Sequence, residues 1–304
     1  MKLGLLSAIL GEFSFEQVIE IAAEIGYQCV ELASWPVGKS VRKYAGVTHL
    51  DVSALDDKYT KRIGECCRFH NVEISALAYY PNPLDPNQEV REAAANHIKN
   101  LIDAAVTLGV YHVNTFIGKD KTKPVEQNFE DFLKVWPAII RYAEQRRVYI
   151  GIENCPMYFT ESEWPGGNNL ASTPKIWRRM FREIDSDYFG LNYDPSHLYL
   201  QGMDYIKPLY EFRDKIFHAH IKDIKMYPDK INDVGLFSYP LEYMSPKLPG
   251  LGDMDWGAFL SALYDIEYDG AICMELEDRT FEKEAEGIMN AVRLSYRYIS
   301  QFIS

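Results

Sequence analysis

The sequence predicts an α/β fold in which eight strand and helix units close into one (β/α)8 TIM barrel, a single domain over residues 1–304. Short apolar runs alternate with longer amphipathic runs to the end of the chain, as in parallel strands joined by helices. Eight units of about forty residues each match the usual length of this barrel. No stretch rich in Pro, Gly and Ser divides them, so we expect one domain.

Eight apolar runs of strand length recur along the chain. They are rich in aliphatic and aromatic residues, which is typical of buried strands. The predicted strands are KLGLLSAI at 2–9, CVELAS at 29–34, EISALAYY at 73–80, HVNTFIG at 112–118, VYIGIENC at 148–155, FGLNYD at 189–194, IFHAHIKDI at 216–224 and GAICMELE at 270–277.

Amphipathic runs follow most of these strands. Ser14 precedes FEQVIEIAAEIG and predicts a helix that begins at a serine cap. Two further helices are expected over 91–109, which stops at a glycine, and over 281–303. The competing fold, an open doubly wound sheet, lacks its GxGxxG motif because the first strand continues as LSAILGEF. The GxG in GLGDMDW at 250–256 follows a proline-rich loop, so we interpret it as a turn into a helix at Trp256.

Composition limits the partners and the compartment. The chain carries 32 Lys and Arg against 44 Asp and Glu, a net charge of −12, which disfavours nucleic acid and anionic membranes as partners. Its five cysteines form no CxxC pair, and adjacent Cys66 and Cys67 are poorly placed for a mutual disulfide. The apolar run near the N-terminus is too short to span a membrane. We therefore expect reduced thiols and a cytoplasmic protein.

Four polar residues stand near the predicted ends of the fifth to eighth strands, where a TIM barrel places its active site. Side chains alternate along a strand, so the apolar residues that face the helices identify the inward-facing neighbours. In IFHAHIKD this alternation directs His218 and His220 inward, with His220 nearer the strand end. The other three strands end in Glu153, Asp194 and Glu275, and both glutamates share the inward parity.

These four residues predict a metal site. A lone histidine there is usually a hydrogen-bonded core residue, and a lone glutamate is usually solvated. Four together favour metal ligation, because a buried carboxylate is costly unless it is paired or binds a cation. Three carboxylates and one imidazole suit Mn²⁺, our first choice, as well as Mg²⁺ or Co²⁺, and accept Zn²⁺. His218 is expected to support the site or the core.

The motifs IENCP, DPSH, HAHIKD and EYDGAICMELED resemble the xylose isomerase-like barrel superfamily of sugar isomerases and epimerases. That superfamily also holds inosose dehydratases and type IV AP endonucleases. The resemblance covers essentially the whole chain, and its motifs specify the superfamily better than the substrate. It implies that Glu153 and Glu275 are both metal ligands and the acid/base pair, that His197 contacts the substrate, and that Lys222 is a substrate contact, a supporting cation or a solvated lysine.

Two positions depart from the ketose 3-epimerase pattern. Those epimerases place a sugar-contacting glutamate six residues after the first ligand and an arginine six residues after the ligand histidine. Here Phe159 and Met226 occupy these places. The departure puts free-ketose 3-epimerisation in question, whereas the HIKD motif is closer to the inosose dehydratase branch.

The expected function is a divalent-metal-dependent sugar isomerase or epimerase in which two carboxylates move a proton through an enediolate. A dehydratase on the same site is the alternative. An AP endonuclease-like hydrolase is disfavoured by the charge and by seven histidines in all, and a non-catalytic sugar-binding barrel remains a further alternative. The substrate is expected to be a small sugar or cyclitol, preferably without phosphate, since no Gly-rich phosphate cradle is present.

Aromatic residues near the strand ends suit a sugar ring. Trp35 and Tyr79 are predicted substrate contacts, with Tyr80 and Trp164 as further candidates. The segment at 226–250 is longer than a usual connection and rich in Tyr and Pro, which predicts a lid or a subunit contact. A homo-oligomer is left open.

Overall fold

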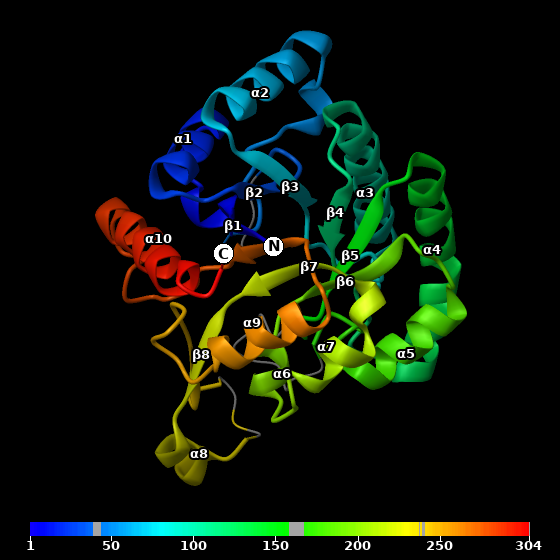
Figure 1. Ribbon diagram of the computed structural model, residues 1–304. Helices are drawn as coiled ribbons and strands as arrows, with labels where there is room; N and C mark the ends of the chain where they lie inside the picture. Colours follow the sequence, from blue (N-terminus) through cyan, green and yellow to red (C-terminus); the bar gives the residue numbers. More distant parts are fainter. Residues whose placement is uncertain (39–43, 158–166, 237, 239–240, 304) are drawn as a thin grey trace.

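The computed structural model describes residues 1–38, 44–157, 167–236, 238 and 241–303. Within this part of the chain, eight parallel strands close into a barrel in the order β1-β10-β7-β6-β5-β4-β3-β2 (Figure 1). They are β1 (Lys2–Leu6), β2 (Cys29–Ala33), β3 (Glu73–Ala78), β4 (His112–Thr115), β5 (Tyr149–Glu153), β6 (Phe189–Tyr193), β7 (Ile216–Ile221) and β10 (Ala271–Met274). The predicted (β/α)8 barrel is confirmed, and each predicted strand corresponds to one barrel strand.

Helices surround the barrel (Figure 1). The longer ones are α1 (Phe15–Ile25), α2 (Asp57–His70), α3 (Gln88–Leu108), α4 (Val125–Arg146), α5 (Pro174–Glu183), α9 (Trp256–Asp265) and α10 (Ala285–Ser300). Short helical segments are η1 (Ser7–Leu10), η2 (Val52–Ala54), α6 (Ser196–Leu200), α7 (Lys207–Glu211), η3 (Arg213–Lys215) and α8 (Pro228–Val234). Among the described residues, no helix combines the length and hydropathy needed to cross a bilayer.

Local capping sets the helix starts. The Ser14 hydroxyl accepts from the Gln17 N–H and the Gln17 side chain accepts from the Ser14 N–H, so the predicted serine cap of α1 is confirmed. The predicted start of α9 at Trp256 is also correct. Helix α3 begins earlier than predicted, because the Asn87 side chain caps it by accepting from the amides of the first turn.

The cysteines are free, as expected from the sequence. Cys29 and Cys273 are buried inside the barrel, where they flank Gly4. A Cβ added at Gly4 would lie 2.6 Å from the Cys273 Sγ and 2.7 Å from the Cys29 Sγ. The two thiols therefore pack against a position that has room only for glycine.

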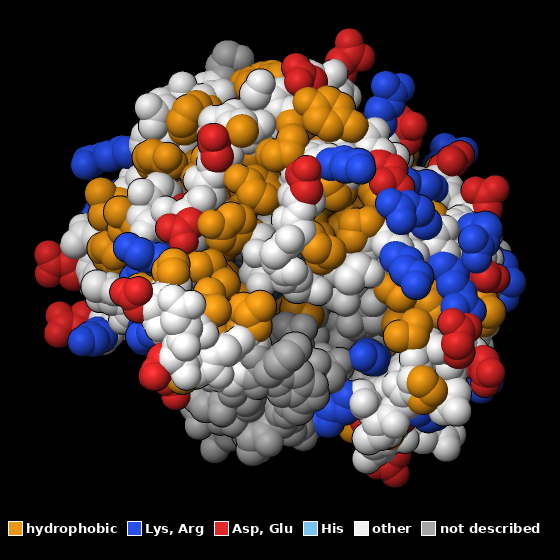
Figure 2. Space-filling view, turned by 90° about the horizontal axis from the view of Figure 1, so that it is seen from below, with side chains coloured by type: hydrophobic (Ala, Val, Ile, Leu, Met, Phe, Trp, Pro, Cys, Tyr) orange, Lys and Arg blue, Asp and Glu red, His pale blue; other side chains and the backbone are white. Residues whose placement is uncertain are grey.

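The surface charge is mixed. On the face shown in Figure 2, Lys and Arg side chains are interspersed with Asp and Glu. The described atoms on this face carry no continuous basic stripe of the kind that follows a nucleic acid backbone.

The seventh predicted strand is corrected by the structure. The run at 216–224 does not continue as one strand, because β7 ends at Ile221 and a second strand, β8 (Asp223–Met226), leaves the barrel. β8 pairs antiparallel with β9 (Met244–Lys247), and the two strands form a hairpin with α8 between them. The predicted long segment is thus largely this hairpin.

The hairpin is fixed by the fully buried carboxylate of Asp223. Its oxygens accept hydrogen bonds from the Gly250 N–H at 2.8 Å, the Met254 N–H at 3.2 Å and the Trp256 Nε1–H at 2.9 Å. One side chain therefore joins the end of β7 to the turn before α9.

Replacing Asp223 with alanine is expected to lower the free energy of unfolding by about 2–4 kcal/mol, because buried donors lose their acceptor. Urea unfolding followed by circular dichroism measures this change. The matched control is Asp253→Ala. Among the described residues the Asp253 carboxylate accepts a hydrogen bond from the Met226 N–H at an exposed position, and its loss is expected to cost below about 1 kcal/mol. Equal costs for the two variants would contradict the anchoring role.

The imidazole of His112 is expected to make the folded state less stable in acid. It stacks on Tyr149 with ring centroids 5.3 Å apart, and burial lowers its pKa to about 4. Between about pH 6.5 and 4, this imidazole is protonated in the unfolded chain and neutral in the folded protein. The free energy of unfolding therefore falls as the pH falls through this window. In His112→Gln, the slope of unfolding free energy against pH should be smaller by about 1.4 kcal/mol per pH unit. Identical slopes measured by urea unfolding would rule out this contribution.

Candidate metal centre

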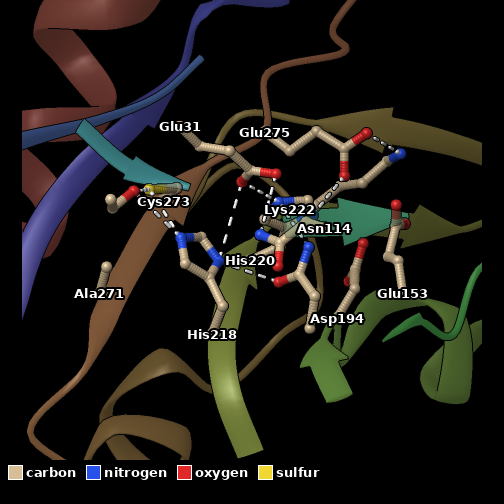
Figure 3. Close-up of polar contacts among 12 residues, drawn as sticks. Glu31, Asn114, Glu153, Asp194, His218, His220, Lys222, Ala271, Cys273 and Glu275 are labelled. Carbon is tan, nitrogen blue, oxygen red and sulfur yellow. Dashed lines mark hydrogen bonds and ion pairs between the residues drawn. The ribbon is translucent and has the colours of Figure 1, made fainter. Parts of the chain in front are cut away.

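The four predicted ligands meet at the carboxyl end of the barrel. Glu153 ends β5, Asp194 follows β6, His220 lies in β7 and Glu275 follows β10. One ligand atom from each lies within 4.8 Å of the others. Figure 3 shows these side chains directed toward a common space. The structure therefore brings together the set that strand parity selected.

Several atoms in this space have no well-aligned hydrogen-bond partner among the described residues. They are Asp194 Oδ2, His197 Nε2, His220 Nδ1 and Glu275 Oε2. These atoms lie close together, with His197 Nε2 3.1 Å from Asp194 Oδ2 and His220 Nδ1 3.2 Å from Glu275 Oε2. Buried polar atoms are nearly always satisfied in native proteins. A divalent cation accepts lone pairs from oxygen and imidazole nitrogen, so the donor set fits such an ion.

His197, the predicted substrate contact, lies beside the ligand set. Its Nε2 is also 3.2 Å from Glu153 Oε1, and the ring lines the adjoining cavity. Burial acts to lower the pKa of His197, but Cys155 and Asp194 outweigh it and hold the pKa well above its ordinary value. Glu153, Cys155 and His197 form a second close group of possible ligands.

The carboxyl groups of Glu153 and Glu275 lie in different electrostatic environments. Burial and the Glu275 carboxylate raise the pKa of Glu153 to about 7, with His197 acting in the opposite direction. Burial also acts to raise the pKa of Glu275, but Lys222 and His220 outweigh it and hold that pKa far below its ordinary value. The pKa of the Glu153 carboxyl therefore lies well above that of the Glu275 carboxyl, and Glu153 is the more readily protonated of the two.

Lys222 is buried beside the site. Its Nζ lies 3.2 Å from Glu275 Oε1 and 2.6 Å from Glu277 Oε2. Burial acts to lower its pKa, but Glu275 and Glu277 outweigh this and raise it. Lys222 is therefore a charged partner of the carboxylates and not a solvated surface lysine.

Sequence reasoning missed Glu31, Asn114 and Asn192, which form a polar layer beneath the ligands together with Tyr80, a candidate sugar contact. These four residues are buried at the centre of the barrel and hydrogen bonded to one another or to the histidines. Glu31 was detectable, because it is an acidic residue inside the apolar strand CVELAS and its alternation with Val30 and Leu32 directs it inward. The asparagines carry no such charge signal.

A cavity of about 850 Å³ adjoins the cluster and is lined by Glu153, His197, Lys222 and Glu275. This volume lies in the range of small-molecule sites. The segment predicted as a lid contributes Tyr227, Lys230 and Met244 to the lining, among others. Figure 1 shows β8 leading away from the barrel strands to α8.

One side of the cavity is apolar. A small cluster separate from the main core lines it, and we call this cluster the apolar wall. Its members are Leu6, Ala78, Tyr80, Phe116 and Met157, with Ala8, Trp35 and Cys155 packed against them. The cavity lining therefore combines charged residues at the ligands, which we call the charged half, with the apolar wall.

The predicted aromatic contacts are placed unequally. Trp35 lines the cavity, but Tyr79 is absent from the described lining and packs edge-on against Trp35 and His97 in the core, with centroids 4.8 and 4.6 Å away. Strand alternation explains this, because Tyr80 and not Tyr79 faces inward after β3. Trp164 and Phe159 lie outside the described residues.

A family model described as a xylose isomerase-like TIM barrel matches residues 19–298. The chain belongs to this family. The resemblance stated from the motifs is thus confirmed at the level of the family.

Two relatives by sequence are the YfiH protein of Bacillus subtilis and an inosose dehydratase of Lactiplantibacillus plantarum. YfiH is 26% identical over 326 residues, covering 99% of this chain and 100% of the relative. The inosose dehydratase is 21% identical over 267 residues, covering 77% of this chain and 85% of the relative.

Two solved structures share the fold. The IolI protein with a bound zinc atom has a TM-score of 0.71 at 20% identity, covering 100% of both chains. D-Psicose 3-epimerase from Clostridium cellulolyticum with D-tagatose also has a TM-score of 0.71, at 15% identity and 100% coverage of both chains.

Metal binding is expected to stabilise the protein. At a free Mn²⁺ concentration of about 100 times the dissociation constant, the free energy of unfolding should rise by about 2.7 kcal/mol over the chelator-treated protein, because the ion binds the folded ligand set. Differential scanning fluorimetry measures the corresponding rise in melting temperature. Asp194→Asn should lose the rise, whereas the exposed control Asp187→Asn should keep it. A wild-type protein unaffected by Mn²⁺, Co²⁺ and Zn²⁺ would refute the site.

Proposed function

We propose that the protein is a divalent-metal-dependent isomerase or epimerase of a keto sugar or related cyclitol. The observation that carries this proposal is the meeting of Glu153 and Glu275, in different electrostatic environments, with unsatisfied ligand atoms at one end of a cavity. Proton transfer next to a carbonyl needs two such groups and a means to stabilise negative charge. Family membership and the sugar-acting relatives support the same class of chemistry.

Each residue has a chemical role in this proposal. The proposed ligands are Glu153, Asp194, His220 and Glu275, and the bound ion would polarise the substrate carbonyl and stabilise the charge on its oxygen. One glutamate removes the proton from the carbon that carries the neighbouring hydroxyl, and the other returns a proton. Return to the opposite face of the same carbon gives the epimer, and return to the adjacent carbon gives the isomer.

The remaining residues orient the substrate. His197 and Lys222 line the cavity beside the glutamates and can donate hydrogen bonds to hydroxyl groups. Trp35 and Tyr80, on the apolar wall, offer ring faces and edges to the C–H face of a sugar ring. A substrate ring bound between the charged half and the apolar wall presents its carbonyl edge to the ligands.

A dehydratase is the second candidate, favoured by the similarity to an inosose dehydratase over 77% of this chain. It would use the same proton removal, followed by loss of a β-hydroxyl as water in place of proton return. An AP endonuclease-like hydrolase is less well supported, because it needs further histidines at the site. Of the other described histidines, His49 bonds Ser7 and Leu10, and His97 bonds the Ser34 carbonyl.

Glu153→Gln is expected to reduce solvent deuterium incorporation by about 10²- to 10⁴-fold, because the amide cannot transfer the proton. The Mn²⁺-loaded protein is incubated in D₂O with D-fructose, D-tagatose or inosose, and exchange is followed by proton NMR. Glu277→Gln, a cavity carboxylate outside the ligand set, should change the rate by less than about tenfold. Exchange by Glu153→Gln at near wild-type rate would exclude the proposed role, and product with a new carbon–carbon double bond would identify the dehydratase.

A further inference from the structure

Glu31 is a buried carboxylate that the proposed chemistry does not use. It lies on β2, fully buried, and reaches across the barrel interior toward His220 on β7 (Figure 3). Its ion-pair contacts within the described residues are to imidazoles, with Oε2 2.6 Å from His220 Nε2 and 3.7 Å from His218 Nδ1. A buried carboxylate is retained only where something compensates its charge.

The contact with His220 fixes which ring nitrogen carries hydrogen. A carboxylate oxygen and a ring nitrogen 2.6 Å apart must share a proton, so Nε2–H donates to Glu31. The other nitrogen, Nδ1, has no well-aligned hydrogen bond among the described residues and faces Glu275 Oε2 at 3.2 Å. Glu31 therefore leaves the lone pair of Nδ1 to the ligand cluster.

His218 shows the contrast on the same strand. Its Nδ1 lies 3.0 Å from Asn192 Oδ1, and its Nε2 lies 3.2 Å from the Ser75 hydroxyl and 3.5 Å from the Cys273 Sγ. Both ring nitrogens thus have protein partners, and neither faces the ligand atoms. The pattern of partners, and not only the depth in the barrel, separates the ligand histidine from its neighbour.

Glu31 is itself held from the opposite side. Its Oε1 accepts hydrogen bonds from the Tyr80 hydroxyl and from Asn114 Nδ2, the latter at 3.1 Å. Asn192 Nδ2 lies 3.0 Å from the Tyr80 oxygen and 3.1 Å from His220 Nε2. Because Nε2 carries hydrogen, Asn192 Nδ2 donates to the tyrosine oxygen. Since Tyr80 also lines the cavity, the network runs from the cavity surface to the ligand histidine.

We propose that Glu31 is a positioning residue that orients His220 and sets its tautomer, so that Nδ1 binds the divalent cation. This inference rests on the proposed metal-dependent function. A carboxylate that accepts the second N–H of a ligand histidine fixes the ring and raises its basicity, and its loss typically weakens metal binding by about 10- to 100-fold. Glu31 is separate from the four ligands and comes from the other side of the barrel.

The test measures metal affinity and not turnover. Isothermal titration of chelator-treated protein with Mn²⁺ is expected to give a dissociation constant about 10- to 100-fold higher for Glu31→Gln than for wild type. Ser75→Ala removes a polar group from the same barrel interior without touching His220, and should stay within about threefold of wild type. The visible spectrum of the Co²⁺-loaded protein should change in Glu31→Gln and not in Ser75→Ala. Only the first variant changes the hydrogen-bond partner of the proposed ligand His220.

Other results would overturn the inference. A Glu31→Gln dissociation constant within about threefold of wild type, or an equal loss in Ser75→Ala, would leave Glu31 without a positioning role. If Glu31→Gln does not fold, Glu31→Asp keeps the charge but withdraws it from His220 by one methylene, and unchanged affinity in that variant would overturn the inference. Absence of Mn²⁺ binding by wild type would instead remove the proposed function on which it rests.

Discussion

The concentration of negative charge at one end of the barrel is the constraint on which the site depends. Glu153 and Asp194 are almost completely buried, and Glu275 is nearly so. Parallel strands that close into a barrel bring these carboxylates together whether or not their charges are compensated. Lys222 and the imidazole of His197 supply part of the compensation within the chain. The unsatisfied atoms that remain are those whose lone pairs a bound cation would use.

Much of this arrangement can be predicted from the sequence, because side chains along a strand alternate between the two faces of the sheet. Once a barrel is assumed, alternation tells which residues face inward, and all strand ends share one edge of the sheet. That reasoning placed Glu153, Asp194, His220 and Glu275 together without any distance information. Tyr79 was chosen only because it is an aromatic residue near a strand end, and alternation gives the inward position after β3 to Tyr80.

The missed features depend on contacts that the local pattern does not encode. The pairing of Glu31 with His220 joins residues 189 positions apart, and Asn114 and Asn192 are inconspicuous in their strands. The break after Ile221 was equally invisible, since IKDI continues an apolar alternation. The strand break is set by Asp223, whose carboxylate accepts hydrogen bonds from Gly250 and Trp256 at the distant start of α9.

The attachment of the hairpin to the barrel separates changes in the cavity lining from changes in the four proposed ligands. The hairpin contributes to the cavity lining but none of the four proposed ligands, and a single buried aspartate fixes its base. Substitutions along it can alter which molecules enter while the proposed acid/base pair stays in place. Exchange of the β8–β9 hairpin between related barrels, with Asp223 retained, would change the cavity lining without changing the four proposed ligands. Such an exchange offers a direct route to new substrate preferences.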